Sequence, residues 1–160
     1  MDAQVAPLYE MLKIDTRLFE NSLDGVDDQR AQIQPSDGAN NMVFIALHLL
    51  DARAYLARYI GIEYQHPFTD LEAVRSIDEM PSFPPVTPVR AAWRQVSDLL
   101  LERFPMLSAD ELSQESAQEF PVEDRTVSGG IAFLLLHESF HIGQIAYLRR
   151  CVGLAPMSYT

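Results

Sequence analysis

The sequence predicts an all-α fold, a four-helix bundle with long connections after the second and third helices. Apolar residues recur at helical spacing in four segments, and the strict alternation typical of strands is absent. The segments are separated by stretches rich in proline, glycine and aspartate. A chain of 160 residues suits one hydrophobic core, so we expect a single helical-bundle domain over residues 1–160.

The first helix is expected over residues 3–23 and the second over residues 39–60. Between them lies a turn in which Ser36 or Asp37 is expected to cap the second helix, and Gly61 is expected to end that helix. The apolar stripe of the first helix consists of Leu8, Leu12, Phe19 and Leu23.

A long connection is expected over residues 61–86, because this stretch has four prolines and no clear period. A short helical piece is expected at residues 70–76. Loops of this length are often functional, so the connection is either a lid over one end of the bundle or a crossover that wraps the core. The third helix is expected to begin at Thr87, an N-cap followed by proline, and to run to Phe104.

A second, acidic connection is expected to be irregular over residues 106–125. The fourth helix is expected to start near Thr126 or Ser128 and to end before Gly153. Two glycines, Gly129 and Gly130, lie early in this helix although glycine is a poor helix former. They would let a neighbouring helix or a ligand come close to the backbone.

The composition narrows the possible partners and the cellular location. A formal charge of −11 and a pI of about 4.6 disfavour binding to nucleic acid and to anionic membranes. No membrane span and no signal peptide are recognised. Cys151 is the only cysteine, which excludes an internal disulfide and fits a reducing compartment. We therefore expect a cytoplasmic protein with neither nucleic acid nor a membrane as its partner.

Two histidines of the fourth helix are the main functional signal. His137 and His141 are four residues apart, which places both imidazoles on one helix face. Leu134, Ile145 and Leu148 share that face, so the imidazoles are expected to point into the core. Such a pair can hold one divalent metal ion if another element supplies the remaining ligands.

The segment from His137 to His141 is also an H-E-x-x-H motif, which in zinc metallopeptidases supplies two ligands and a glutamate general base. Those enzymes take a third ligand downstream, but no Asp, Glu or His follows His141. The peptidase interpretation is therefore the weaker one. His48 of the second helix is the natural third ligand, because facing helices of a bundle direct side chains to a shared site.

The C-terminal sequence LLHESFHIGQIAYLRRCVG resembles the last helix of the DinB-like family, also called YfiT-like metal-dependent hydrolases. The residues from Ala46 to Arg53, which read AxHLLDAR, support the resemblance. It implies a metal site formed by His48, His137 and His141, with nickel or zinc as the usual occupant. It also implies a homodimer, and some relatives are transferases that use low-molecular-weight thiols as cosubstrates.

Three further residues are candidates for supporting or catalytic roles. His66 is expected to be a solvated loop histidine; the alternatives are a fourth ligand or an acid/base group carried by a lid. Gln144 shares the face of the histidine pair, so it either orients a ligand or bonds to a neighbouring helix. Glu138 is turned by about 100° from His137; it is expected to orient a neighbouring group, to act as a base or to face solvent.

Two classes of function follow. The first is a metal-dependent hydrolase or thiol S-transferase, in which the ion acts as a Lewis acid on a small molecule. The second is a non-enzymatic helical module that works by dimerisation or partner binding, with a structural or empty metal site.

Overall fold

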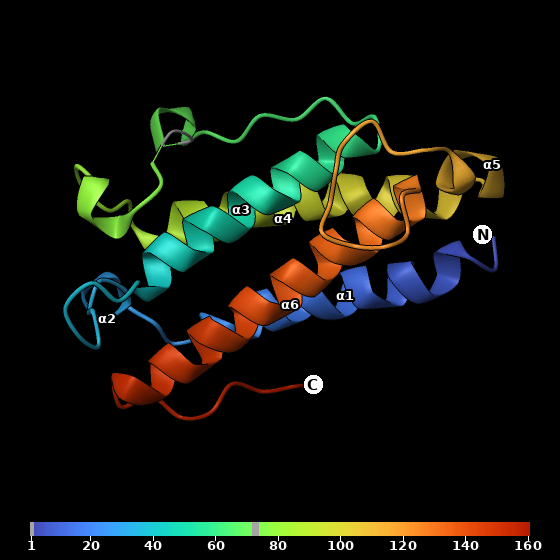
Figure 1. Ribbon diagram of the computed structural model, residues 1–160. Helices are drawn as coiled ribbons and strands as arrows, with labels where there is room; N and C mark the ends of the chain where they lie inside the picture. The colour runs from blue at the N-terminus through green and yellow to red at the C-terminus, as the bar shows by residue number, and fades with distance from the viewer. Residues whose placement is uncertain (1, 72–73) are drawn as a thin grey trace.

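The computed structural model describes residues 2–71 and 74–160, and it is all-α as predicted (Figure 1). Four long helices form the body of the molecule: α1 (Val5–Ser22), α3 (Met42–Tyr59), α4 (Val86–Arg103) and α6 (Val127–Cys151). Two short helices, α2 (Asp28–Ala31) and α5 (Ala109–Ser113), lie in the connections. The described residues contain no β-strand, only an isolated bridge between Glu115 and Thr126.

The four long helices surround one hydrophobic core. Helix α1 contacts α4 and α6, and α3 contacts the same two helices from the other side. The buried apolar side chains of all four helices form one cluster, in which the fully buried Trp93 stacks on Phe19 with ring centroids 4.0 Å apart. Burying one such large side chain contributes roughly 2–3 kcal/mol, so the apolar stripes hold the helices together.

The caps of α3 and α4 differ from the sequence-based expectation. Asn41, rather than Ser36 or Asp37, caps α3, because its Oδ1 accepts the backbone N–H of Phe44 at 2.9 Å. Helix α4 begins at Val86 rather than after Thr87. The backbone N–H of Val86 donates to Asp28 Oδ1 of α2 at 2.8 Å, a partner 58 residues away that local sequence could not reveal.

The two connections are more structured than expected. The first contains short 3₁₀ turns at Thr69–Leu71 and Ile77–Glu79. Only the beginning of the helical piece expected at 70–76 is therefore helical; residues 72 and 73 lie outside the described residues, and 74–76 are not helical. The second connection contains the 3₁₀ turn Phe104–Met106 and α5, which begins with a capping box formed by Ser108 and Glu111.

Helix α6 starts and ends as predicted. Thr126 caps its N-terminus, and Gly153 follows its end with a φ of +81°. A Cβ on Gly130 would lie 2.5 Å from the Tyr59 hydroxyl, and one on Gly129 would lie 2.2 Å from a backbone oxygen of Asp124. The two glycines therefore permit close packing by neighbouring segments. By length and composition α6 could also cross a membrane, but here it packs on α1 and α3.

Candidate metal centre

Three imidazoles from two helices meet at one point. His48 lies on α3, and His137 and His141 lie one turn apart on α6. His137 Nε2 is 3.1 Å from His48 Nε2 and 3.1 Å from His141 Nε2. We call this group the imidazole triad. Two nitrogens bound to one transition-metal ion at about 2.1 Å lie roughly 3.0–3.4 Å apart, so the spacing fits a shared ion.

The hydrogen bonds of the rings also fit a cation. His141 Nδ1 is 2.7 Å from Gln144 Oε1, and because an amide oxygen can only accept, Nδ1 carries the proton. His141 Nε2 therefore presents a lone pair toward His137. Three neutral imidazoles that converge through Nε2 cannot make hydrogen bonds along all of their contacts, because each ring has a single N–H. A divalent ion that accepts a lone pair from each Nε2 atom would satisfy all three rings.

The environment keeps two of the rings in the neutral form that binds metals. The pKa of His137 is lowered to about 4, mainly by partial burial and also by the nearby His141 and His48. Burial is also the main cause of the lowered pKa of His48; His141 lowers it further, whereas Asp51 opposes the shift. At neutral pH both rings are therefore uncharged and able to donate a lone pair.

The prediction that the two α6 histidines point into the core was wrong. Leu134, Ile145 and Leu148 on the same face are buried, but His137 and His141 are only half-buried, and His48 is exposed. His48 of α3 and His141 of α6 instead line a pocket. A ligand can therefore reach the triad from solvent.

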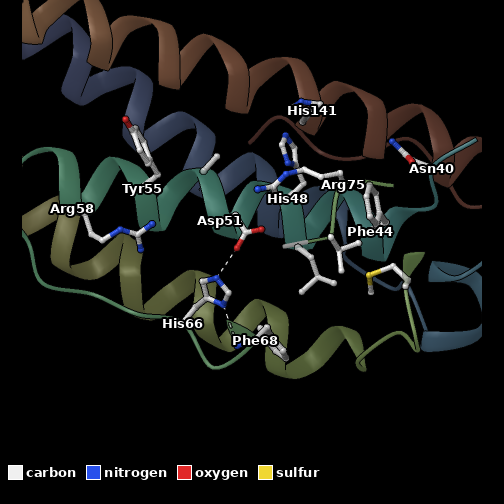
Figure 2. Close-up of a pocket in the computed structure, with 14 residues that line it drawn as sticks. Asn40, Phe44, His48, Asp51, Tyr55, Arg58, His66, Phe68, Arg75 and His141 are labelled. Carbon is white, nitrogen blue, oxygen red and sulfur yellow. Dashed lines mark hydrogen bonds and ion pairs between the residues drawn. The ribbon is translucent and has the colours of Figure 1, made fainter. Parts of the chain in front are cut away.

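The pocket lies along one face of α3 and is closed on the other side by the connection between α3 and α4 (Figure 2). Its volume is about 680 Å³. We call it the α3 pocket. Its lining residues are Asn40, Phe44, Leu47, His48, Asp51, Ala52, Tyr55, Arg58, His66, Phe68, Val74, Arg75, Met80 and His141. Two triad members stand in its wall, so a molecule bound in the pocket would lie next to the triad.

His66 is buried against α3, contrary to the expectation of a solvated loop histidine. Only 2% of its side chain is exposed, and its Nε2 lies 2.6 Å from Asp51 Oδ1. Its Nδ1 accepts the backbone N–H of Phe68 at 3.1 Å, on the side of the ring away from Asp51 (Figure 2). The contact ties the connection to α3 and orients the Asp51 carboxylate, which is 38% exposed in the pocket wall.

Glu138 is nowhere near the pocket surface. It is fully buried and forms a two-pronged ion pair with Arg53 of α3: Nε donates to Oε1 at 2.9 Å and Nη2 to Oε2 at 2.6 Å. Of the three roles considered, the structure leaves only the supporting one, since a carboxylate enclosed in this way can neither face solvent nor touch a substrate. Glu138 is therefore not placed to act as the general base of a peptidase.

A layer of polar residues surrounds this ion pair. Arg53 Nη1 also donates to Thr16 Oγ1 of α1 and to Ser97 Oγ of α4. Nearby, the Ser139 hydroxyl donates to the buried Asp15 carboxylate. We call these six residues the Arg53 layer; its members are Asp15, Thr16, Arg53, Ser97, Glu138 and Ser139. Burial raises the pKa of Glu138 to about 7 and that of Asp15 to about 6, although Arg53 lowers both.

Sequence reasoning identified the triad and Gln144 but missed Asp51 and Arg53. Asp51 lies three residues after His48, and this spacing on a helix could have suggested a shared face. Arg53 stands between two alanines in the largely apolar α3, and a charged side chain that is buried usually has a partner. That the partner is Glu138 could not be foreseen, because 85 residues separate the two.

The fold and the site define a class: an all-helical protein in which histidines of two adjacent helices converge beside a pocket. The family model of the DinB superfamily matches residues 11–145, which include all three triad residues. The chain belongs to the DinB superfamily. No curated protein matches the sequence.

Proposed function

We propose that the protein binds one divalent transition-metal ion, nickel or zinc, through His48, His137 and His141. The convergence of three Nε2 atoms carries this proposal, because two of the separations are 3.1 Å and all three atoms lie within 4.8 Å of one another. Imidazole donors suit both metals. Superfamily membership is consistent with the proposal.

We further propose that the site is catalytic, as a hydrolase or thiol S-transferase acting on a small organic molecule in the α3 pocket. When bound, the ion would supply Lewis-acid chemistry and favour the deprotonated form of a coordinated water or thiol. Because three ligands come from the described residues, positions for a substrate or cosubstrate would stay open. A low-molecular-weight thiol is the cosubstrate expected for the transferase reaction.

The residues of the pocket have separable roles in this proposal. Phe44, Phe68 and Met80 offer apolar surface for the body of a substrate, and Arg58 offers a positive charge that can hold an anionic group. The connection between α3 and α4 limits the entry of water. Asp51 is the carboxylate available to accept a proton in the pocket, and His66 holds it in place.

Metal binding is tested on protein purified without a histidine tag. We expect about one equivalent of metal per chain, loss of binding in His48→Ala and in His137→Ala, and retention in the control His66→Phe. The catalytic proposal is then tested with the metal-loaded protein, by assaying ester hydrolysis and thiol transfer to electrophiles. Wild-type activity that is absent in Asp51→Asn, while metal binding is retained, supports the assigned roles.

A non-enzymatic role remains the second candidate, and one observation favours it. Leu136, Phe140 and Tyr147 are spaced along one face of α6, and each is more than 60% exposed. Such a stripe is suited to a helix of another protein molecule. If Phe140→Asp converts a dimer to a monomer in light scattering, and no thiol or anion binds to the metal-loaded protein, the interaction role replaces the catalytic one.

A further inference from the structure

We infer that the Arg53 layer positions the two metal-bearing helices, so that Arg53 and Glu138 set the geometry of the imidazole triad without touching the ion. The inference rests on the proposed metal site. Arg53 lies five residues after His48 on α3, and Glu138 follows His137 directly on α6. The ion pair therefore joins the same two helices as the triad, about 7.5 Å from His48 along α3 and one residue from His137 on α6.

The contacts of Arg53 reach every long helix. From α3 its guanidinium bonds to Glu138 of α6, to Thr16 of α1 and to Ser97 of α4. It also lies over the Trp93 ring of α4, 3.8 Å from the ring centroid. Hydrogen bonds of this kind have a preferred length and direction, so they hold the helices at one relative height and rotation.

Stability alone does not explain the ion pair. Both side chains are fully buried, and removing two charges from water is costly. Replacing such a pair with apolar residues of similar volume is often neutral or stabilising. The best-supported use of buried polar groups is to fix the register of packed helices. In this molecule, register decides whether His48 meets the two histidines of α6.

The remaining contacts around the triad would tolerate small shifts. Near this level α3 and α6 present leucine, isoleucine and alanine side chains, whose packing is not directional. A metal site requires its donors within about 0.2 Å of the ideal distance. A slide of about 1 Å between α3 and α6 would therefore weaken metal binding while most of the hydrophobic burial was kept.

The test separates metal affinity from stability in the double variant Arg53→Met/Glu138→Leu, which replaces the ion pair with apolar side chains of similar size. We expect a melting temperature at or above that of the wild type and a nickel or zinc affinity that is 10–100-fold weaker. Affinity is measured by competition with a chromophoric chelator. The absorption bands of the cobalt-loaded protein should also shift, which a purely stabilising role would not cause.

The chain offers a matched control. Glu20 of α1 receives hydrogen bonds from Arg90 and Arg94 of α4, so it joins two helices that carry no triad residue. Glu20→Gln weakens this interhelical ion pair, and we expect the metal affinity to stay within twofold of the wild type. Equal losses of affinity in Glu20→Gln and in the double variant would overturn the inference.

A second variant decides the matter if the double variant does not fold. Arg53→Lys keeps the charge but loses the fork that engages both carboxylate oxygens, so we expect a folded protein with at least threefold weaker metal binding. Unchanged affinity in a folded Arg53→Lys, or in a folded double variant, contradicts the inference while leaving the metal site intact. A wild type that binds no metal contradicts the proposed function itself, and the inference falls with it.

Discussion

The imidazole triad and the Arg53 layer occupy neighbouring positions on the same two helices, yet they are opposite in character. The triad lies beside a pocket, the lowered pKa values of His48 and His137 keep these two rings neutral, and the ring nitrogens face one another. At the centre of the Arg53 layer, the ion pair of Arg53 and Glu138 is closed to solvent, and the guanidinium bonds to three other helices. His137 and Glu138 are adjacent in sequence, but the turn of about 100° between them directs His137 to the triad and Glu138 to the core.

This difference shows why the H-E-x-x-H motif is a poor guide here. In that motif the glutamate works because it reaches the substrate beside the metal. In this chain the same residue is enclosed and paired with Arg53. The role of each residue therefore follows from the face of α6 on which it lies.

The largest expected effect comes from truncating the two neighbours separately. Glu138→Ala leaves the Arg53 charge buried without its main partner, so we expect a loss of about 3–5 kcal/mol in the free energy of unfolding. His137→Ala removes a half-buried neutral ring, so we expect a loss below about 1 kcal/mol in the metal-free protein. Urea denaturation of both variants measures the contrast, and similar losses would contradict the division between the two sites.

The next effect depends on pH and concerns Asp15. Its pKa is raised from 3.8 to about 6, so between pH 4 and pH 6 the folded state holds a proton that the unfolded state has released. The contribution of this group to stability is therefore greatest at low pH, falls through that range and stays low above it. A difference of about two pKa units corresponds to about 3 kcal/mol.

Asp15→Asn replaces the ionisable carboxyl group, so the fall in stability that Asp15 causes with rising pH is removed. We expect the variant to match the wild type near pH 4 and to be more stable by about 1–3 kcal/mol at pH 8, with the lower value if the amide fits the Ser139 hydroxyl poorly. The difference between the two urea midpoints is followed over pH 4–8. A difference that does not change with pH would mean that Asp15 is ionised throughout that range.

The smallest expected effect concerns the imidazole triad. Gln144→Ala removes the acceptor that orients His141, so we expect metal affinity to fall about tenfold and stability to change by less than about 0.5 kcal/mol. Calorimetric titration with zinc measures the first quantity and thermal unfolding the second. Unaltered zinc affinity would indicate that Gln144 only bonds to a neighbouring ring without positioning it.

The helices and the pairing of His137 with His141 could be predicted because they depend on local spacing, whereas His48, 89 residues from His137, was assigned from the packing of facing helices and from the family resemblance. The apolar periods define the four long helices, and the i, i+4 spacing places His137 beside His141. The remaining features depend on contacts between distant residues. Asp28 accepts the first backbone N–H of α4 from Val86, 58 residues further along the chain, and Arg53 pairs with Glu138, which lies 85 residues away. His66 is buried because the connection folds back on Asp51, which the composition of a proline-rich segment does not reveal.

The central claim is that His48, His137 and His141 bind one ion together. The most direct test is X-ray absorption spectroscopy of the nickel- or zinc-loaded protein, together with anomalous diffraction from its crystals. The account predicts one ion per chain, with three imidazole nitrogens at about 2.0–2.1 Å. An ion held by fewer than three of these imidazoles, or one bound elsewhere on the chain, would contradict it.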